Sequence, residues 1–115
     1  MTPTQRTLAL CRKHGWTTQV VERWCAFSRR RIDLFGVIDV LAIDDSLTIG
    51  IQTTSGSCVS ARIKKSLECE PLVRWLVGPN RKFFVHGWRK LKKTGKWECR
   101  EIQITLVDGK LLVDE

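Results

Sequence analysis

The chain has no tyrosine, one methionine and two histidines among its 115 residues. The histidines, His14 and His86, lie far apart in the sequence, and none of the five cysteines forms a CxxC pair, so we expect no structural zinc site. No apolar run approaches the length of a membrane-spanning helix, and the first residues lack the apolar core of a signal peptide. An odd number of cysteines without pairing motifs favours free thiols and a reduced, cytoplasmic location.

A second absence is that of basic residues in one part of the chain. No lysine or arginine occurs between Ile32 and Ala61, although the chain as a whole carries a net charge of +8. A basic excess of this size favours a nucleic-acid partner over an anionic membrane surface, because Lys and Arg neutralise backbone phosphates. All the charged residues of this stretch are acids, and basic residues flank it on both sides. The acids are Asp33, Asp39, Asp44 and Asp45.

The apolar pattern predicts one domain over residues 1–115. A capping box at Thr2–Gln5 starts a first helix that ends near Gly15. A β-prone segment follows at 19–24, then an irregular basic segment, then two buried strands joined by a turn at Asp44–Asp45. The strands are predicted at Leu34–Ile43 and Leu47–Thr54.

The second half predicts two helices followed by strands. Val59, Ile63 and Leu67 recur every four residues and indicate the inner face of one helix. A second helix is predicted at 72–77, ended by Gly78–Pro79, and hairpin turns are predicted near residues 94–95 and 108–109. The fold class is therefore α/β, with a single mixed β-sheet flanked by helices.

Asp39 is the position on which the functional hypothesis depends. It interrupts an apolar run, and a buried carboxylate needs a compensating partner such as a metal ion, a helix terminus or an arginine. A purely structural role, in which Asp39 caps a backbone turn, is the alternative. A hairpin through Asp44–Asp45 would bring Asp39 close to Gln52. Asp33 is interpreted as a turn or strand-entry residue rather than as a ligand.

The run Gly36–Ile43, a short turn, Ile49–Ser55 and a following helix together resemble the core of the PD-(D/E)XK nuclease superfamily. The resemblance, over roughly residues 1–90, is to the compact Holliday junction resolvases and VRR nucleases, including small phage-encoded members. It implies a restriction-endonuclease-like αβββαβ core, here with C-terminal β-hairpins. It also implies Mg²⁺ or Mn²⁺ bound by Asp39, with Gln52 at the position of the second acid and Glu22 as an additional acid. The alternative for Glu22 is an ion pair with Arg23 or Arg31 at the surface.

The sequence departs from the family motif at two positions. Gln52 is neutral, although its amide oxygen can still bind a hard metal ion, and Thr54 stands where the family has its lysine. In some members that lysine comes from the following helix, which makes Lys64 the catalytic candidate and Lys65 a nucleic-acid-binding one. The lysine would orient the attacking water and stabilise charge developing on the phosphate.

Two basic segments are candidates for nucleic-acid binding, with solvated surface as the alternative in each case. Trp24 and Trp88 are candidates for base stacking because cationic residues flank them. The first segment comprises Arg29, Arg30 and Arg31, and the second comprises Arg89, Lys90, Lys92 and Lys93.

The resulting prediction is a metal-dependent endonuclease or resolvase-like enzyme that hydrolyses DNA phosphodiester bonds. The alternative is a non-catalytic nucleic-acid-binding module on the same fold, favoured by Thr54. A third interpretation is a basic protein with a protein partner. The resemblance to junction resolvases implies a homodimer.

Overall fold

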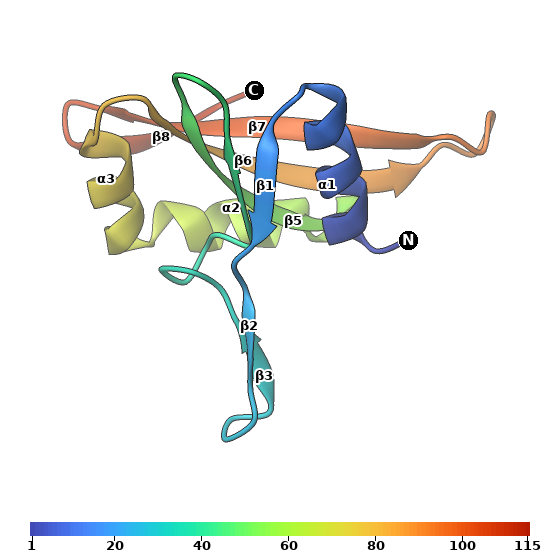
Figure 1. The fold of residues 1–115 in the computed structure, drawn as a ribbon, viewed down its shortest axis with the longest axis horizontal. Coiled ribbons are helices and arrows are strands. Elements are labelled where there is room, and N and C mark those ends of the chain that lie inside the picture. Colours follow the sequence, from blue (N-terminus) through green and yellow to red (C-terminus); the bar gives the residue numbers. More distant parts are fainter.

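A six-stranded mixed sheet with helices on both faces organises the chain in a computed structural model that describes residues 1–115 (Figure 1). Strands β5 and β6 pair in parallel, and the other neighbours pair antiparallel. In sheet order the strands are β1 (Thr17–Val20), β4 (Val40–Ile43), β5 (Thr48–Ser55), β6 (Arg81–Lys90), β7 (Trp97–Val107) and β8 (Lys110–Asp114). None of the helices has the length and apolar character needed to cross a membrane.

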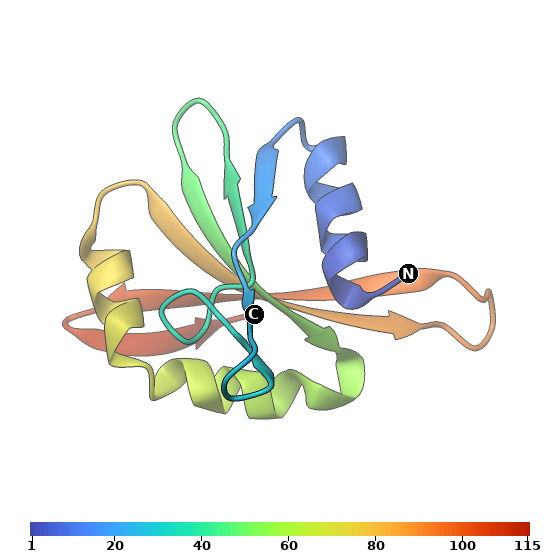
Figure 2. The same cartoon turned by 60° about the horizontal axis from the view of Figure 1, so that its bottom comes forward.

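Three helices cover the sheet, and Figure 2 shows α1 and α3 at opposite ends of the fan of strands. They are α1 (Pro3–Lys13), α2 (Val59–Leu67) and α3 (Glu70–Val77), with a short 3-10 turn η1 (Gly56–Cys58) before α2. The expected capping box is present, since the Thr2 hydroxyl accepts a hydrogen bond from the Gln5 amide and the Gln5 side chain accepts one from the Thr2 amide. The α/β class with a mixed sheet flanked by helices is confirmed.

Two apolar cores lie on opposite faces of the sheet, because successive strand residues point to opposite sides. Beneath α1, Cys11 packs with Val40, Ala42, Ile49 and Ile51. Beneath α2 and α3 lies the larger cluster. Its buried members are Val37, Ile38, Val59, Leu72, Phe83, Val85, Ile102 and Ile104.

A buried polar network joins α1 to the sheet. The Thr7 hydroxyl lies 3.1 Å from His86 Nδ1 and accepts a hydrogen bond from Trp88 Nε1 at 3.0 Å. His86 Nε2 lies 2.9 Å from the Glu101 carboxylate. Since Thr7 and His86 are almost fully buried, these bonds fix the helix on the sheet and give His86 a structural role.

The apolar run at 34–43 is not one continuous strand, contrary to prediction. Strand β4 begins only at Val40, and residues 33–38 form a turn closed by a Gly36 amide to Asp33 carbonyl bond and a Leu34–Ile38 bridge. Phe35 and Gly36 both have positive φ, at 54° and 83°, which ends the extended conformation. Asp39 therefore lies at a bend rather than in the middle of a strand.

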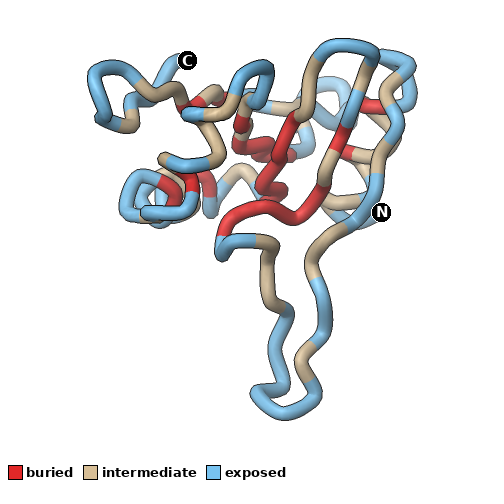
Figure 3. Tube along the Cα trace, turned by 60° about the vertical axis from the view of Figure 1, so that its left-hand side comes forward, coloured by how far each residue is buried: buried red, intermediate tan, exposed pale blue.

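The segment 19–24, predicted as one strand, is divided in two. The amides of Val21 and Glu22 both donate to the Asp39 carbonyl, at 2.8 and 3.3 Å, and the chain leaves the sheet there. It continues as β2 (Arg23–Cys25), which pairs with β3 (Arg30–Ile32) in a separate two-stranded sheet. Figure 3 shows this hairpin projecting from the body; we call residues 23–32 the arm. The basic segment, predicted to be irregular, is divided: Ser28 and Arg29 lie in the turn of the arm, and Arg30 and Arg31 lie in its second strand.

The remaining strands, helices and turns agree with the sequence analysis. The turn at Asp44–Asp45 joins β4 to β5, and hairpins join β6 to β7 and β7 to β8. One detail differs in α2, where Val59 is buried but Leu67 is 38% exposed. The helix ends at Leu67, which is partly exposed, whereas its neighbour Ser66 is fully buried.

Gly87 sets how closely α2 packs on β6. A Cβ at this position would overlap the Val59 side chain, and the β-branched valine has little freedom to move away. We expect Gly87→Ala to lower the free energy of unfolding by about 1–3 kcal/mol, measured by urea denaturation. Because the clash is with one side chain, the Gly87→Ala/Val59→Ala double variant should lose less than the sum of the two single variants; strict additivity would contradict this packing.

Candidate functional site

Three carboxylates converge where the arm joins the sheet. Each of the three residues places one carboxylate oxygen within 4.8 Å of those of the other two; they are Glu22, Asp33 and Asp39. Glu22 belongs to the link between β1 and β2, Asp33 follows β3, and Asp39 precedes β4. The two strands of the arm thus bring Glu22 and Asp33 next to Asp39, and we call the three residues the acid cluster.

Asp39 is the most buried member of the acid cluster, with 3% of its surface exposed. Its Oδ2 accepts hydrogen bonds from Gln52 Nε2 at 2.7 Å and from the Thr53 amide at 2.8 Å. Burial, followed by the hydrogen bond and the charge of neighbouring Asp33, raises the pKa of Asp39 to about 8. Asp39 therefore holds a proton at neutral pH when no cation neutralises it.

The pKa of Asp33 is shifted in the direction opposite to that of Asp39. Burial opposes its ionisation, but hydrogen bonds from Asp39 and Gln52 and the charge of Lys65 together lower its pKa below the ordinary value. Lys65 Nζ lies 3.3 Å from Asp33 Oδ2, and Gln52 Nε2 donates to the same oxygen at 3.3 Å. Asp33 and Asp39 thus share one proton, which is the usual outcome for two carboxylates held in contact.

Gln52 lies between the two aspartates and leaves one of its own atoms without a partner. Its amide nitrogen donates to both Asp33 and Asp39, while its Oε1 is buried and makes no hydrogen bond. A buried, unsatisfied carbonyl oxygen is costly, and such an atom in a folded protein needs an explanation. If the amide is rotated so that its oxygen faces the aspartates, the oxygen joins the carboxylates as a possible cation ligand.

A polar pocket of about 430 Å³ surrounds the acid cluster, and its lining includes no hydrophobic residue. The start of α1, the end of β5 and the outer side of α2 all contribute to its wall. Three cations, Arg31, Arg62 and Lys65, stand at its edge. Arg31 Nη1 lies 3.0 Å from Glu22 Oε1, so two of these cations already contact the acid cluster. The pocket therefore offers a negative centre within a positive rim.

The structure brings together several residues that the sequence analysis selected. Glu22, Asp39, Gln52, Lys65 and Arg31 all line the polar pocket. The contact between Asp39 and Gln52 expected from the hairpin is confirmed. Thr54 also lines the pocket, where it places a hydroxyl rather than a cation.

Other selected residues lie elsewhere. Lys64 is exposed on α2 and does not line the polar pocket, whereas its neighbour Lys65 does. Arg29 and Arg30 lie farther out on the arm. Trp88 is only 9% exposed and is bonded to Thr7, so it is not available for base stacking, whereas Trp24 is 62% exposed. The second basic group, Arg89, Lys90, Lys92 and Lys93, lies around the β6–β7 turn and contributes nothing to this pocket.

Asp33 belongs to the pocket although the sequence analysis did not select it for the site and interpreted it as a turn or strand-entry residue. It does close the turn with Gly36, but its carboxylate also belongs to the acid cluster. The available signal was its place two residues after Arg31, since residues two apart in a strand share a face. That signal required β3 to be recognised as a strand.

Comparisons with protein-family models, with curated proteins and with solved structures give no match to this chain. The function is therefore inferred from the geometry of the pocket.

The shared proton predicts an unusual dependence of stability on pH. In metal-free buffer the free energy of unfolding should fall as the pH rises from about 5 to about 8, because the folded protein retains the Asp39 proton while the unfolded chain has released it. Asp39→Asn should remove most of this slope, and Asp45→Asn, at an exposed acid in a turn, should keep it. Urea denaturation with EDTA across this range is the measurement; equal slopes in all three proteins would contradict the shared proton.

Proposed function

We propose that the protein is a metal-dependent nuclease that hydrolyses phosphodiester bonds in DNA. The observation that carries the proposal is the convergence of Glu22, Asp33 and Asp39 at the centre of a polar pocket with a cationic rim. Carboxylates bind hard cations such as Mg²⁺ and Mn²⁺, and arginine and lysine neutralise phosphates. A site for phosphodiester hydrolysis needs both kinds of group side by side.

The donor set suits Mg²⁺ or Mn²⁺. Three carboxylates can supply the charge, and Gln52 can supply a neutral oxygen ligand when its amide is rotated so that Oε1 faces the aspartates. A bound ion would remove the reason for Asp39 to keep its proton, because the cation replaces the proton as the neutralising charge. The ion would polarise a phosphoryl oxygen and lower the pKa of a bound water.

Lys65 is the side chain we assign to charge stabilisation. Its ammonium group lies 3.3 Å from Asp33, so Lys65 reaches the acid cluster from α2. Thr54 on β5, which stands at the position of the family lysine, supplies no cation. A cation there can hold a non-bridging phosphate oxygen and offset the negative charge that develops during hydrolysis. Arg31 and Arg62, which also line the pocket, can hold the adjacent phosphates.

The arm is the element we assign to binding the nucleic acid outside the pocket. Its sequence, residues 23–32, contains four arginines and no acid. Trp24 pairs across the arm with Arg31, and Arg31 contacts Glu22, so this face continues into the acid cluster. Phe27 at the tip is fully exposed. An exposed cationic hairpin with two exposed aromatic rings can bind phosphates and stack on bases.

The order of elements supports the same proposal. Helix α1, the antiparallel strands β1, β4 and β5, the helices α2 and α3, and the parallel strand β6 follow the αβββαβ order expected from the resemblance to PD-(D/E)XK nucleases. The acid cluster lies where β4 begins and beside Gln52 of β5, as the resemblance implies for its metal site.

A non-catalytic nucleic-acid-binding module is the second candidate. It is favoured by the two ion pairs, Arg31 with Glu22 and Lys65 with Asp33, because these let the protein balance part of the acid cluster with its own cations. Such a module would bind DNA through the arm and would need neither a metal ion nor a lysine at position 54.

Metal binding and DNA cleavage together test the proposal. We expect saturable Mn²⁺ binding by titration calorimetry, and cleavage of plasmid, linear or four-way-junction DNA with Mg²⁺ or Mn²⁺ that stops with EDTA. Asp39→Asn and Asp33→Asn should lose both activities, because each removes a charged ligand, whereas Asp45→Asn should retain them. DNA binding without metal binding and without cleavage would favour the non-catalytic module.

The adjacent lysines Lys64 and Lys65 provide a matched pair of variants. Lys65→Met should lower the cleavage rate by about 10²-fold or more, because it removes a cation that contacts the acid cluster. Lys64→Met changes the charge by the same amount on the exposed side of the same helix and should cleave at the wild-type rate. The measurement is the single-turnover rate at saturating protein. A larger loss in Lys64→Met would assign the catalytic role to the other lysine.

Arginines of the arm should account for the salt dependence of DNA binding. Arg29→Ala/Arg30→Ala should weaken binding and reduce the slope of log affinity against log salt by about one unit for each phosphate that the arm no longer neutralises. Lys92→Ala/Lys93→Ala removes the same charge at the β6–β7 turn and serves as the control. Fluorescence anisotropy in EDTA, over a range of salt, gives both slopes. A reduced slope in the lysine variant alone would place the DNA on the other hairpin.

A further inference from the structure

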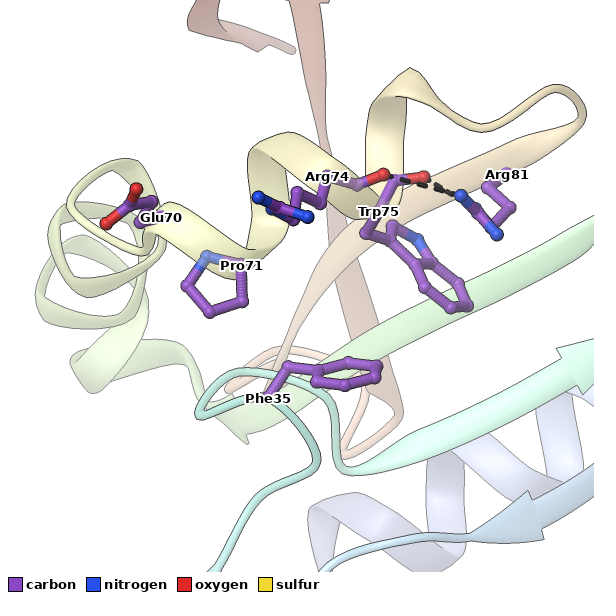
Figure 4. A pocket seen from close by; sticks show the side chains of 6 residues that line it. All are labelled: Phe35, Glu70, Pro71, Arg74, Trp75 and Arg81. Carbon is purple, nitrogen blue, oxygen red and sulfur yellow. Dashed lines mark hydrogen bonds between the residues drawn. The ribbon is translucent and has the colours of Figure 1, made fainter.

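A second pocket, of about 460 Å³, lies between the turn at residues 33–38 and helix α3, and its chemistry differs from that of the acid cluster (Figure 4). Aromatic and apolar side chains form part of the wall, and two arginines and one acid complete it. The lining residues are Phe35, Glu70, Pro71, Arg74, Trp75 and Arg81. We call it the aromatic pocket.

The rings of Phe35 and Trp75 form part of the wall of the aromatic pocket. The ring centroids of Phe35 and Trp75 are 6.5 Å apart and the ring planes are tilted by 46°. Trp75 is held in place, because its Nε1 donates to the Lys82 carbonyl at 2.9 Å and it packs against the larger core. Phe35 is 53% exposed, so about half of its surface remains available to a ligand.

Phe35 occupies a position that the backbone does not favour for phenylalanine. Its φ of 54° lies in the left-handed region, which glycine and asparagine adopt at lower cost. Half of the residue is exposed, so burial does not explain why a large ring occupies this turn. A backbone conformation of this kind, combined with an exposed aromatic ring in a pocket wall, indicates a ligand contact.

The polar groups of the aromatic pocket suit a ligand with a planar ring and a negative charge. Arg81 donates to the Trp75 carbonyl at 2.7 Å, and its guanidinium lies 5.4 Å from the Trp75 ring centre, so its position is fixed. Arg74 forms no ion pair and its charge is free to meet an anion. The Glu70 carboxylate can accept hydrogen bonds from an amino group of a base.

The aromatic pocket is linked to the acid cluster through the turn they share. Phe35 is two residues after Asp33, so the Cα atoms of the two residues are at most about 7 Å apart. The Cys69 thiol donates to the Phe35 carbonyl at 3.3 Å and connects the turn to the residues just before α3. Because the two pockets share this short turn, one DNA strand can contact both of them.

We propose that the aromatic pocket takes one unpaired nucleotide of the DNA strand bound at the acid cluster. The base stacks on Phe35 and Trp75, and Arg74 contacts its phosphate. A base paired within a duplex is stacked on its neighbours and cannot offer its faces to two protein rings, so the substrate carries a single-stranded segment beside the cleaved bond. This inference rests on the proposed nuclease function and specifies its substrate class.

The test compares a blunt DNA duplex with the same duplex carrying a short single-stranded overhang, by fluorescence anisotropy in EDTA. We expect the wild-type protein to bind the overhang DNA about tenfold more tightly, in the range measured for stacking of one base on an aromatic side chain. Phe35→Asn and Arg74→Ala should reduce this preference toward the value for the blunt duplex. Phe35→Tyr, which keeps the ring, should retain it.

The controls separate loss of the pocket from loss of the fold. Asparagine tolerates positive φ, so Phe35→Asn should unfold at or near the wild-type temperature. Val77→Ala, at an exposed position of α3 outside the aromatic pocket, and Arg12→Ala, on the surface of α1, should bind both DNAs as the wild type does. Together they show whether a change is specific to the ring and the charge of the pocket.

The outcomes distinguish this inference from the nuclease proposal. Equal wild-type affinity for both DNAs, or an unchanged preference in Phe35→Asn, overturns the aromatic pocket as a nucleotide site, even where cleavage is observed. A preference that depends on Phe35 and Arg74, without metal-dependent cleavage, supports the nucleotide site and contradicts the nuclease. Absence of DNA binding by every variant and by the wild type overturns both.

Discussion

Asp39 is the residue through which the sheet, the arm and the acid cluster are connected. Its amide donates to the Ile51 carbonyl of β5, and its own carbonyl accepts from the amides of Val21 and Glu22 where the chain leaves the sheet. Its carboxylate is held by Gln52 and Thr53 and shares a proton with Asp33. The backbone bonds that begin the arm and the side-chain bonds that build the acid cluster therefore belong to one residue, and neither set can shift without the other.

The distribution of charge follows from this arrangement. The acids concentrate where β4 begins, and Arg31 of the arm and Lys65 of α2 each contact one of them. Two of the three cluster carboxylates are thereby balanced by arginine or lysine, and Asp39, the most buried, is balanced by a proton. A divalent cation can replace that proton, and phosphates can compete for the guanidinium and ammonium groups. Such a site is stable as it stands and can exchange its neutralising charges for those of a ligand.

Features set by short stretches of sequence were predictable. The capping box at Thr2, the turn at Asp44–Asp45 and the Asp108–Gly109 hairpin each depend on neighbouring residues, and each is present. The approach of Asp39 to Gln52 also followed, because the hairpin between them is short. In the candidate site, Glu22 and Gln52 were selected together with Asp39, and all three line one pocket; Lys65, selected for nucleic-acid binding, lines it too. Lys64 was selected as the catalytic candidate, but Lys65 is the lysine that lines the pocket, because the rotation of α2 against the sheet decides which of the two faces it.

Long-range interactions account for what the sequence analysis missed. An apolar run such as 34–43 predicts a strand, and nothing local shows that Phe35 adopts a positive φ and turns the chain. The arm begins where the pairing of β1 with β4 ends, at the two amides of Val21 and Glu22 that bond to the single Asp39 carbonyl. Composition and local patterning were enough for the class of fold, the basic character and the importance of Asp39, since these depend on residue type and on near neighbours. The membership of the acid cluster and the existence of the aromatic pocket depend on which distant segments come into contact, and the packing of the whole chain determines those contacts.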